Sequence, residues 1–183
     1  MSNPLRILGT LDRHLTLPVE LTLFGRSALA LGYPQSPVDF HNTQDVDGIL
    51  PLAWLQPPEA HQDFWQAIER TNTELEPDGL YLTHLFRETE VILQPHWFNN
   101  RIRLNLDLQY LTVFRPATID LILTKMARAD EDDLKDIAFL LQQETMTPEL
   151  LEAAFDCARV PEVVEIQEIF NRARPKVLAL VAG

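Results

Sequence analysis

The chain has 183 residues, of which 46% are hydrophobic and 23% are charged, and its formal net charge at pH 7 is −12. This composition excludes an intrinsically disordered chain, because the apolar content is that of a folded globular protein. The excess of acidic residues excludes a broad surface for nucleic-acid backbones, since such surfaces need many lysine and arginine side chains.

The first predicted element is a short amphipathic helix near the N-terminus. Its leucines recur at spacings of three and four residues, at Leu5, Leu8, Leu11 and Leu15. This is the pattern of a helix with one apolar face. Asp12 interrupts the apolar core that a signal peptide needs, and no stretch reaches the roughly 20 apolar residues that span a bilayer. We therefore expect a cytoplasmic protein that has no membrane partner.

A strand, a glycine turn and a second strand follow in the sequence. Residues 19–24 have strand character and are ended by Gly25, after which residues 27–31 are compatible with a short helix. Turn-forming residues then fill the chain up to residues 45–50, a second brief strand that Pro51 ends. This part of the chain predicts a sheet with a short helix beside it.

The middle of the chain predicts one helix and three further strands. The helix covers residues 57–72, and the strands cover residues 80–86, 90–95 and 101–110. The last strand has the clearest pattern, because apolar and polar residues alternate along it, which places them on opposite faces. Asp107 lies on the polar face of this strand.

The C-terminal part is helical in pattern. Four segments each carry an apolar stripe, at residues 117–129, 131–143, 147–160 and 161–175. The predicted fold class is therefore α+β, with a small mixed sheet flanked by helices and a helical part after it. We expect residues 1–115 to form the α/β core and residues 116–183 to pack on it as one compact unit.

The pair Asp45 and Asp47 is the first candidate site. On a strand, residues two apart point to the same face, so these carboxylates can lie side by side as hard oxygen ligands for Mg²⁺. An isolated Asp-x-Asp is more often a solvated turn than a metal site. The five histidines show no spacing typical of a zinc site, so no metal role is assigned to them.

Features on both sides of this pair strengthen the metal hypothesis. Gly25 allows the backbone to approach a phosphate, and Ser27 stands at the start of a short helix whose amide groups can bind phosphate oxygens. Asp107 can supply a third carboxylate. Taken singly, each has an ordinary explanation: a turn without a ligand for Gly25 and Ser27, and an exposed side chain for Asp107.

Together these motifs resemble the minimal nucleotidyltransferase superfamily, the polymerase-beta-like fold, and especially its AbiEii-like branch of toxins and nucleotidyltransferases. The segment "LFGRSALALGY" looks like the family's strand, glycine turn and helix, "TQDVDGIL" like its metal-binding strand, and "RLNLDLQYL" like the strand that carries a third acid. The segment "DLILTKMARADEDDLKDIAFLL" is similar to the branch's later helical signature. The resemblance covers about residues 17–141 and implies a nucleotidyltransferase-like fold.

The resemblance implies catalytic and metal-binding roles for four aspartates. Asp45, Asp47 and Asp107 would coordinate Mg²⁺, with two ions as the expected cofactor. Asp107 or Asp136 would help to accept the proton of the attacking group. The implied reaction transfers a nucleoside monophosphate from a nucleoside triphosphate to an acceptor hydroxyl and releases pyrophosphate.

The resemblance also implies nucleotide-binding residues, namely Gly25, Arg26, Ser27, Lys125 and Arg128. Arg26 departs from the family, which has a second glycine or a serine there, although its guanidinium group can itself bind phosphate. Lys125 and Arg128 have an alternative explanation, because they lie three residues apart on a predicted helix and can form surface ion pairs with neighbouring acids.

Partners follow from the same resemblance. The expected ligand is a nucleoside triphosphate, and the acceptor is a protein side chain, an RNA end or a small metabolite. Toxin members of the family commonly have an antitoxin, so a partner protein of that kind is a further expectation.

Two alternative interpretations stay open. In one, the chain is a catalytically degenerate member that serves as a nucleotide-binding or protein-interaction module, and Arg26 is the residue that most favours it. In the other, the chain is an α+β domain in which the Asp-x-Asp is accidental. Asp132 is a further departure from the family, because relatives commonly have arginine there, and this change would alter the acceptor site.

Overall fold

The computed structural model describes residues 2–181 and has an α+β fold. The chain forms two compact units, one made of residues 1–87 and 101–115, and the other of residues 88–100 and 116–183. It therefore enters the second unit twice, whereas the sequence predicted a single crossing after residue 115. Every helix in the described part of the chain is too short or too polar to span a membrane.

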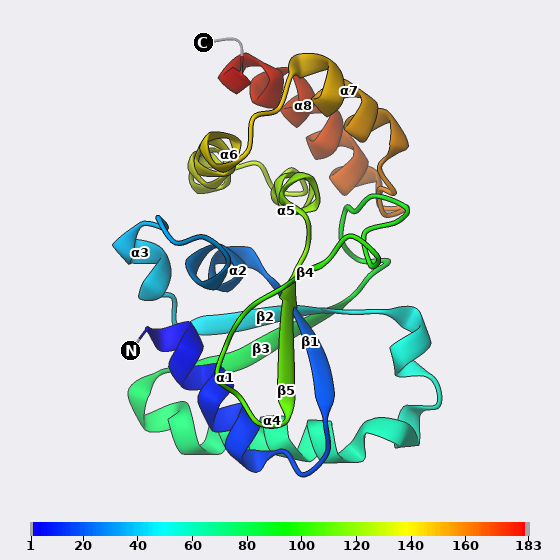
Figure 1. The fold of residues 1–183 in the computed structure, drawn as a ribbon. Helices are drawn as coiled ribbons and strands as arrows, with labels where there is room; N and C mark the ends of the chain where they lie inside the picture. The colour runs from blue at the N-terminus through cyan, green and yellow to red at the C-terminus, as the bar shows by residue number, and fades with distance from the viewer. Residues whose placement is uncertain (1, 182–183) are drawn as a thin grey trace. The chain divides into compact units, whose positions relative to one another are not determined.

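The first unit contains a five-stranded mixed sheet with the strand order β3-β2-β1-β5-β4 (Figure 1). The central strand β1 pairs antiparallel with β2 and parallel with β5, and the outer pairs are β2 with β3 in parallel and β5 with β4 in antiparallel. The strands are β1 (Val19–Phe24), β2 (Asp45–Leu50), β3 (Tyr81–Arg87), β4 (Ile102–Arg103) and β5 (Leu111–Arg115).

Helices of the first unit contribute to its core. They are α1 (Asn3–His14), α2 (Gly25–Gly32), α3 (Val38–His41) and α4 (Gln62–Leu75), with 3-10 turns at Leu52–Leu55, Pro58–His61 and Glu76–Asp78. Helices α1 and α4 pack against each other, and both contact strands of the sheet. Ile7 and Leu11 of α1 and Leu23 of β1 are completely buried, which confirms the apolar face predicted for the first helix.

Two strand predictions were wrong. Residues 90–95 form no strand, and only Leu93 makes an isolated bridge, to Arg159. In residues 101–110 only Ile102–Arg103 are a strand, because the Leu106 and Leu108 N–H groups donate to carbonyls two residues earlier and turn the chain away from β5. Alternating polarity fits such a succession of tight turns as well as it fits a strand.

The second unit is helical, as predicted. It consists of α5 (Thr118–Lys125), α6 (Glu131–Gln143), α7 (Pro148–Cys157) and α8 (Val164–Val181), together with the irregular segment 88–100. Helix α8 continues past Pro175, where the sequence pattern predicted its end. Large apolar side chains fill the interior of this unit, among them Trp97, Ile122, Leu140, Phe155 and Phe170.

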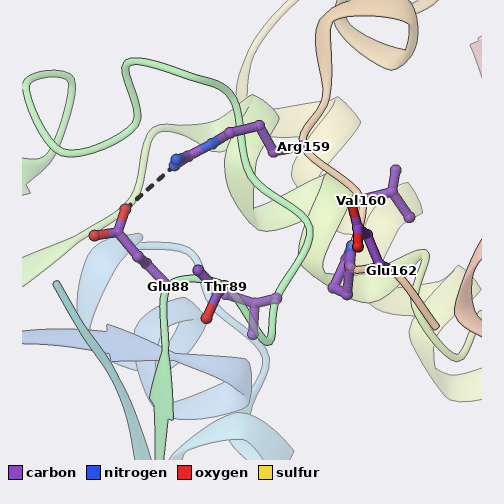
Figure 2. A pocket seen from close by; sticks show the side chains of 7 residues that line it. Glu88, Thr89, Arg159, Val160 and Glu162 are labelled. Carbon is purple, nitrogen blue, oxygen red and sulfur yellow. Dashed lines mark hydrogen bonds and ion pairs between the residues drawn. The ribbon is translucent and has the colours of Figure 1, made fainter. Parts of the chain in front are cut away.

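Segment 88–100 is tied to the chain after α7 by backbone and side-chain contacts. Leu93 and Arg159 exchange backbone hydrogen bonds, and the Arg159 guanidinium group lies 3.3 Å from the Glu88 carboxylate (Figure 2). The Trp97 indole N–H donates to the same carboxylate oxygen at 3.0 Å. These contacts explain why the segment belongs to the helical unit although it is inserted between two strands of the sheet.

Asp12 connects helix α1 to the start of β5. Its carboxylate is only 9% exposed and accepts three backbone N–H groups, from Gln109 at 2.9 Å, Tyr110 at 2.7 Å and Leu111 at 2.8 Å. These N–H groups belong to Leu111, the first residue of β5, and to the two residues before it, so one side chain satisfies three backbone donors.

We expect Asp12→Ala to lower the free energy of unfolding by about 2–4 kcal/mol, because it leaves the partly buried N–H groups of residues 109–111 without an acceptor. Chemical denaturation by urea measures this change. Asp107→Ala, at an exposed position in the same connection, is the matched control and should change the free energy by less than about 0.5 kcal/mol. Equal effects of the two substitutions would contradict a structural role for Asp12.

Candidate metal centre

Asp45 and Asp47 lie on the same face of β2, as the sequence predicted. Val46 between them is completely buried, whereas both aspartates are partly accessible, so the strand turns its two carboxylates away from the core. The Thr43 hydroxyl donates to the Asp45 carboxylate at 2.8 Å and orients it. The pair is therefore held by the strand itself and by the residue that leads into it.

His84 of β3 joins this pair. One potential ligand atom from each of Asp45, Asp47 and His84 lies within 4.8 Å of the others, which makes these residues a group that can hold a metal ion. The Nδ1 atom of His84 is 3.1 Å from a carboxylate oxygen of Asp47. The imidazole is 62% exposed and the Asp47 side chain 20% exposed, so the group opens to solvent on the His84 side.

A β-bulge places His84 on this face. Val46 pairs with Leu82 and Gly48 pairs with Leu85, so two residues of β3, Thr83 and His84, stand opposite Asp47 alone. In a regular ladder His84 would stand opposite Gly48, with its side chain on the other face of the sheet. The extra residue shifts it to the face of the aspartates. His84 could not be predicted as a ligand from the sequence, because a bulge does not change the alternation of polar and apolar residues.

The electrostatics of the group favour a cation. Burial raises the pKa of the Asp47 carboxyl above its usual value of 3.8, and the neighbouring negative charge of Asp45 raises it further, while His84 acts in the opposite direction. Two carboxylates this close repel each other when both are ionised. A divalent cation between them would remove that repulsion, and carboxylate oxygen with imidazole nitrogen is a donor set used by divalent metals in proteins.

The glycine turn lies directly beside this group. Phe24 at the end of β1 pairs with Asp47, and Gly25 follows with a left-handed φ of 63°. A Cβ atom on Gly25 would lie 3.4 Å from a carboxylate oxygen of Asp47 and would also strain the backbone. The structure therefore brings together the glycine turn and the aspartate pair, which are some twenty residues apart in the sequence.

Arg26 and Ser27, which follow Gly25, both contact other residues of the first unit. The Ser27 side chain is buried, and its hydroxyl donates to the Phe24 carbonyl at 2.9 Å, which closes the first turn of α2. Arg26 is half-buried, and its guanidinium carbon lies 5.7 Å from the centre of the Phe40 ring. Ser27 thus stabilises the turn from inside, while Arg26 adds a positive charge to it.

Asp107 does not join the aspartate pair, so the prediction that it lies beside them was wrong. It is exposed in the connection between β4 and β5, just before β5 begins opposite Val19. The aspartate pair lies at the other end of β1, opposite Phe24. About 16 Å of strand separates Val19 from Phe24. The predicted strand geometry failed here because the chain leaves the sheet after Arg103.

Lys125, Arg128 and Asp136 belong to a network of ion pairs in the second unit. The Lys125 ammonium group lies 2.6 Å from the Asp136 carboxylate and 3.2 Å from that of Asp133, and all three side chains are at least nine-tenths buried. The exposed Arg128 pairs with Asp133 at 2.8 Å and with Asp130 at 2.7 Å. The alternative of surface ion pairs is therefore wrong for Lys125, because its ion pairs are buried.

Comparison with protein-family models, curated proteins and solved structures found no match to this chain. The resemblance to nucleotidyltransferases therefore depends on the motifs themselves, and the roles that it implies for individual residues stay predictions.

We expect Lys125→Met to lower the free energy of unfolding by about 3–5 kcal/mol, because it leaves the buried carboxylates of Asp133 and Asp136 without their shared cation. Lys135→Met is the matched control, since Lys135 forms an exposed pair with Asp132 on the same helix, and it should cost less than about 1 kcal/mol. Urea denaturation of the full chain compares the two. A cost for Lys125→Met no larger than that of the control would show that the buried pairs do not hold α5 to α6.

Asp120 of α5 is a further buried acid of this unit, in addition to Asp133 and Asp136 of the network. Its side chain is fully buried, one carboxylate oxygen accepts the Gln94 N–H at 2.7 Å, and the other has no hydrogen-bond partner among the described residues. Burial raises its pKa from 3.8 to about 6, although the Gln94 hydrogen bond and the positive charge of Arg159 act against the shift. In the folded state the Asp120 carboxyl is therefore mostly protonated below about pH 6 and mostly ionised above it.

The raised pKa makes stability depend on pH in a defined direction. The folded state binds the Asp120 proton more tightly than the unfolded state does. The contribution of this proton to the free energy of unfolding is therefore complete below about pH 4 and is lost as the pH rises through about 6. Asp120→Asn keeps an acceptor for Gln94 but cannot ionise. From pH 4 to 7 the wild-type chain should lose about 2–3 kcal/mol of stability relative to this variant. Urea denaturation at both pH values tests this, and a constant difference would contradict it.

Proposed function

We propose that the protein is a magnesium-dependent nucleotidyltransferase that transfers a nucleoside monophosphate from a nucleoside triphosphate to an acceptor hydroxyl. The observation that supports this most directly is the convergence of Asp45, Asp47 and His84, with ligand atoms within 4.8 Å of one another, beside the left-handed turn at Gly25. Metal ligands and a backbone turn suited to phosphate are the two parts that such a reaction requires.

The donor set fits a divalent cation. Asp45 and Asp47 offer hard oxygen ligands from one strand, and His84 offers a nitrogen from the next. Burial, and after it the negative charge of Asp45, raises the pKa of the Asp47 carboxyl, and a bound cation would oppose both effects. When bound, Mg²⁺ would neutralise triphosphate charge and polarise the reacting phosphoryl group. Asp107 has no part in this proposal because it lies at the other end of the sheet.

The start of α2 would hold the phosphates. Its first backbone N–H groups have no side-chain cap, and Gly25 leaves the space next to Asp47 free of a Cβ atom. Uncapped N–H groups at a helix start attract anions, and Arg26 in the same turn adds a full positive charge. These groups act by binding and orienting the triphosphate, which is how most catalysis of phosphoryl transfer arises.

The acceptor in this proposal is a hydroxyl group of a protein, an RNA end or a small metabolite, and a second protein of the antitoxin kind is a proposed partner. The net charge of −12 argues for an acceptor recognised at a local site, because an acidic surface repels long nucleic-acid backbones.

A catalytically degenerate nucleotide-binding or protein-interaction module is the second candidate. It is favoured by the third ligand, which is an exposed imidazole instead of a carboxylate, and by Lys125, whose charge is already compensated by Asp133 and Asp136. As a nucleotide-binding module it would bind a nucleotide without transferring it, and as a protein-interaction module it would need no nucleotide.

Calorimetric titration with each of the four nucleoside triphosphates tests the binding step. We expect binding that requires Mg²⁺ and that weakens by at least about tenfold in the double variant Asp45→Asn with Asp47→Asn, because both carboxylate charges are removed. Asp39→Asn, an exposed position on α3, is the control for the loss of acidic charge and should bind as the wild type does.

Transfer of label from α-³²P nucleoside triphosphates to protein and RNA fractions tests the reaction itself. Metal-dependent labelling that the double variant abolishes supports the enzyme, and metal-dependent binding without any labelling supports the degenerate module. If none of the four nucleotides binds in the presence of Mg²⁺ or Mn²⁺, the enzyme and the nucleotide-binding module are both wrong, and only the protein-interaction module is left.

A further inference from the structure

A pocket with a basic rim lies in the second unit, between the turn before α6 and one face of α8. Its cavity of about 350 Å³ is lined by Arg128, Ala129, Ile169, Arg172, Ala173 and Lys176. No acidic side chain is among these six, although the chain as a whole carries a net charge of −12. The charged side chains that line this cavity are therefore all basic, although Asp130 and Asp133 lie beside it in ion pairs with Arg128.

Helix α8 supplies four of the six residues from one face. Ile169, Arg172, Ala173 and Lys176 follow the spacing of three and four that brings side chains together on a helix. Ala173 is 1% exposed, and the small alanine side chains leave room for a ligand between the longer ones. Ile169 adds an apolar wall, so the pocket offers contacts to a group larger than a simple inorganic ion.

The cations of α8 are available to a ligand. The Arg172 Nε atom donates to the Glu168 backbone carbonyl at 3.3 Å, and within residues 2–181 neither Arg172 nor Lys176 takes part in an ion pair. Both are exposed. Their charges are therefore not compensated by the protein, in contrast to that of Lys125.

Arg128 contributes a guanidinium group of fixed position. Its Nε atom lies 2.7 Å from Asp130 and 2.8 Å from Asp133, and its Nη2 atom donates to Asp133 at 3.0 Å. These pairs reduce its net charge but hold the side chain at the pocket, so little conformational entropy is lost when it contacts a ligand.

We propose that this pocket binds the phosphate group of a small organic phosphate. Arg172 and Lys176, which form no ion pair among the described residues, together match the charge of a dianion, the Arg172 guanidinium group matches phosphate oxygens, and the apolar wall at Ile169 accommodates the organic part. The volume is within the range of small-molecule sites. The site uses none of the metal ligands, so the inference goes beyond the proposed transferase activity and does not depend on it.

Titration of the full chain with AMP by calorimetry, in a buffer that contains EDTA, tests this site without the metal centre. We expect AMP to bind, inorganic phosphate to bind more weakly, and adenosine not to bind. The double variant Arg172→Gln with Lys176→Gln should weaken AMP binding by at least about tenfold, because two uncompensated charges are lost. Lys176→Arg keeps the charge and should retain binding.

Arg174→Gln is the matched control. Arg174 lies on the same helix but pairs with Asp156 and is not part of the pocket, so this variant should bind AMP as the wild type does. The site is absent if AMP does not bind in EDTA, if the double variant and the control lose binding equally, or if adenosine binds as tightly as AMP. Loss of AMP binding in Asp45→Asn with Asp47→Asn, but not in Arg172→Gln with Lys176→Gln, would assign the nucleotide to the metal centre and overturn the inference.

Discussion

The pairing of Phe24 with Asp47 is the contact on which the candidate metal centre depends. Because β1 and β2 are antiparallel and meet in this register, the turn that leaves β1 lies next to the face of β2 that carries the two carboxylates. A shift of one residue would turn Asp45 and Asp47 towards the core, where Val46 now lies. Gly25 completes the arrangement, since its left-handed backbone and missing Cβ leave space beside Asp47.

Cationic side chains have two different surroundings in the second unit. Inside, Lys125 is shared between Asp133 and Asp136, and these buried groups satisfy one another at close distance. At the surface, Arg172 and Lys176 stay uncompensated around a cavity. Arg128 connects the two arrangements, because Asp133 pairs with it as well as with Lys125. A cationic side chain in a buried ion pair stabilises the fold, whereas a cationic side chain that lines a cavity without an ion pair attracts anions.

Much of the fold and part of the site followed from local patterns. The strand before Gly25, the strand at Asp45 and the helices after residue 117 were confirmed, because apolar periodicity and turn residues act over short distances. The helix predicted at residues 57–72 was also found, but it covers Gln62–Leu75. The strand predicted at residues 101–110 was mostly wrong, since alternating polarity also fits tight turns. The position of Asp107 was wrong for the same reason.

The sequence alone determined that Asp45 and Asp47 share a face, because side chains two apart on a strand point the same way. It also determined an acidic chain with an α+β fold. Only the tertiary structure decided which third group joins the pair. His84 reaches it through a bulge between two strands more than thirty residues apart, and Arg128 lines the same pocket as Lys176, although the two residues belong to different elements of the second unit. Such contacts depend on how separate elements pair and pack, and local sequence patterns do not encode that.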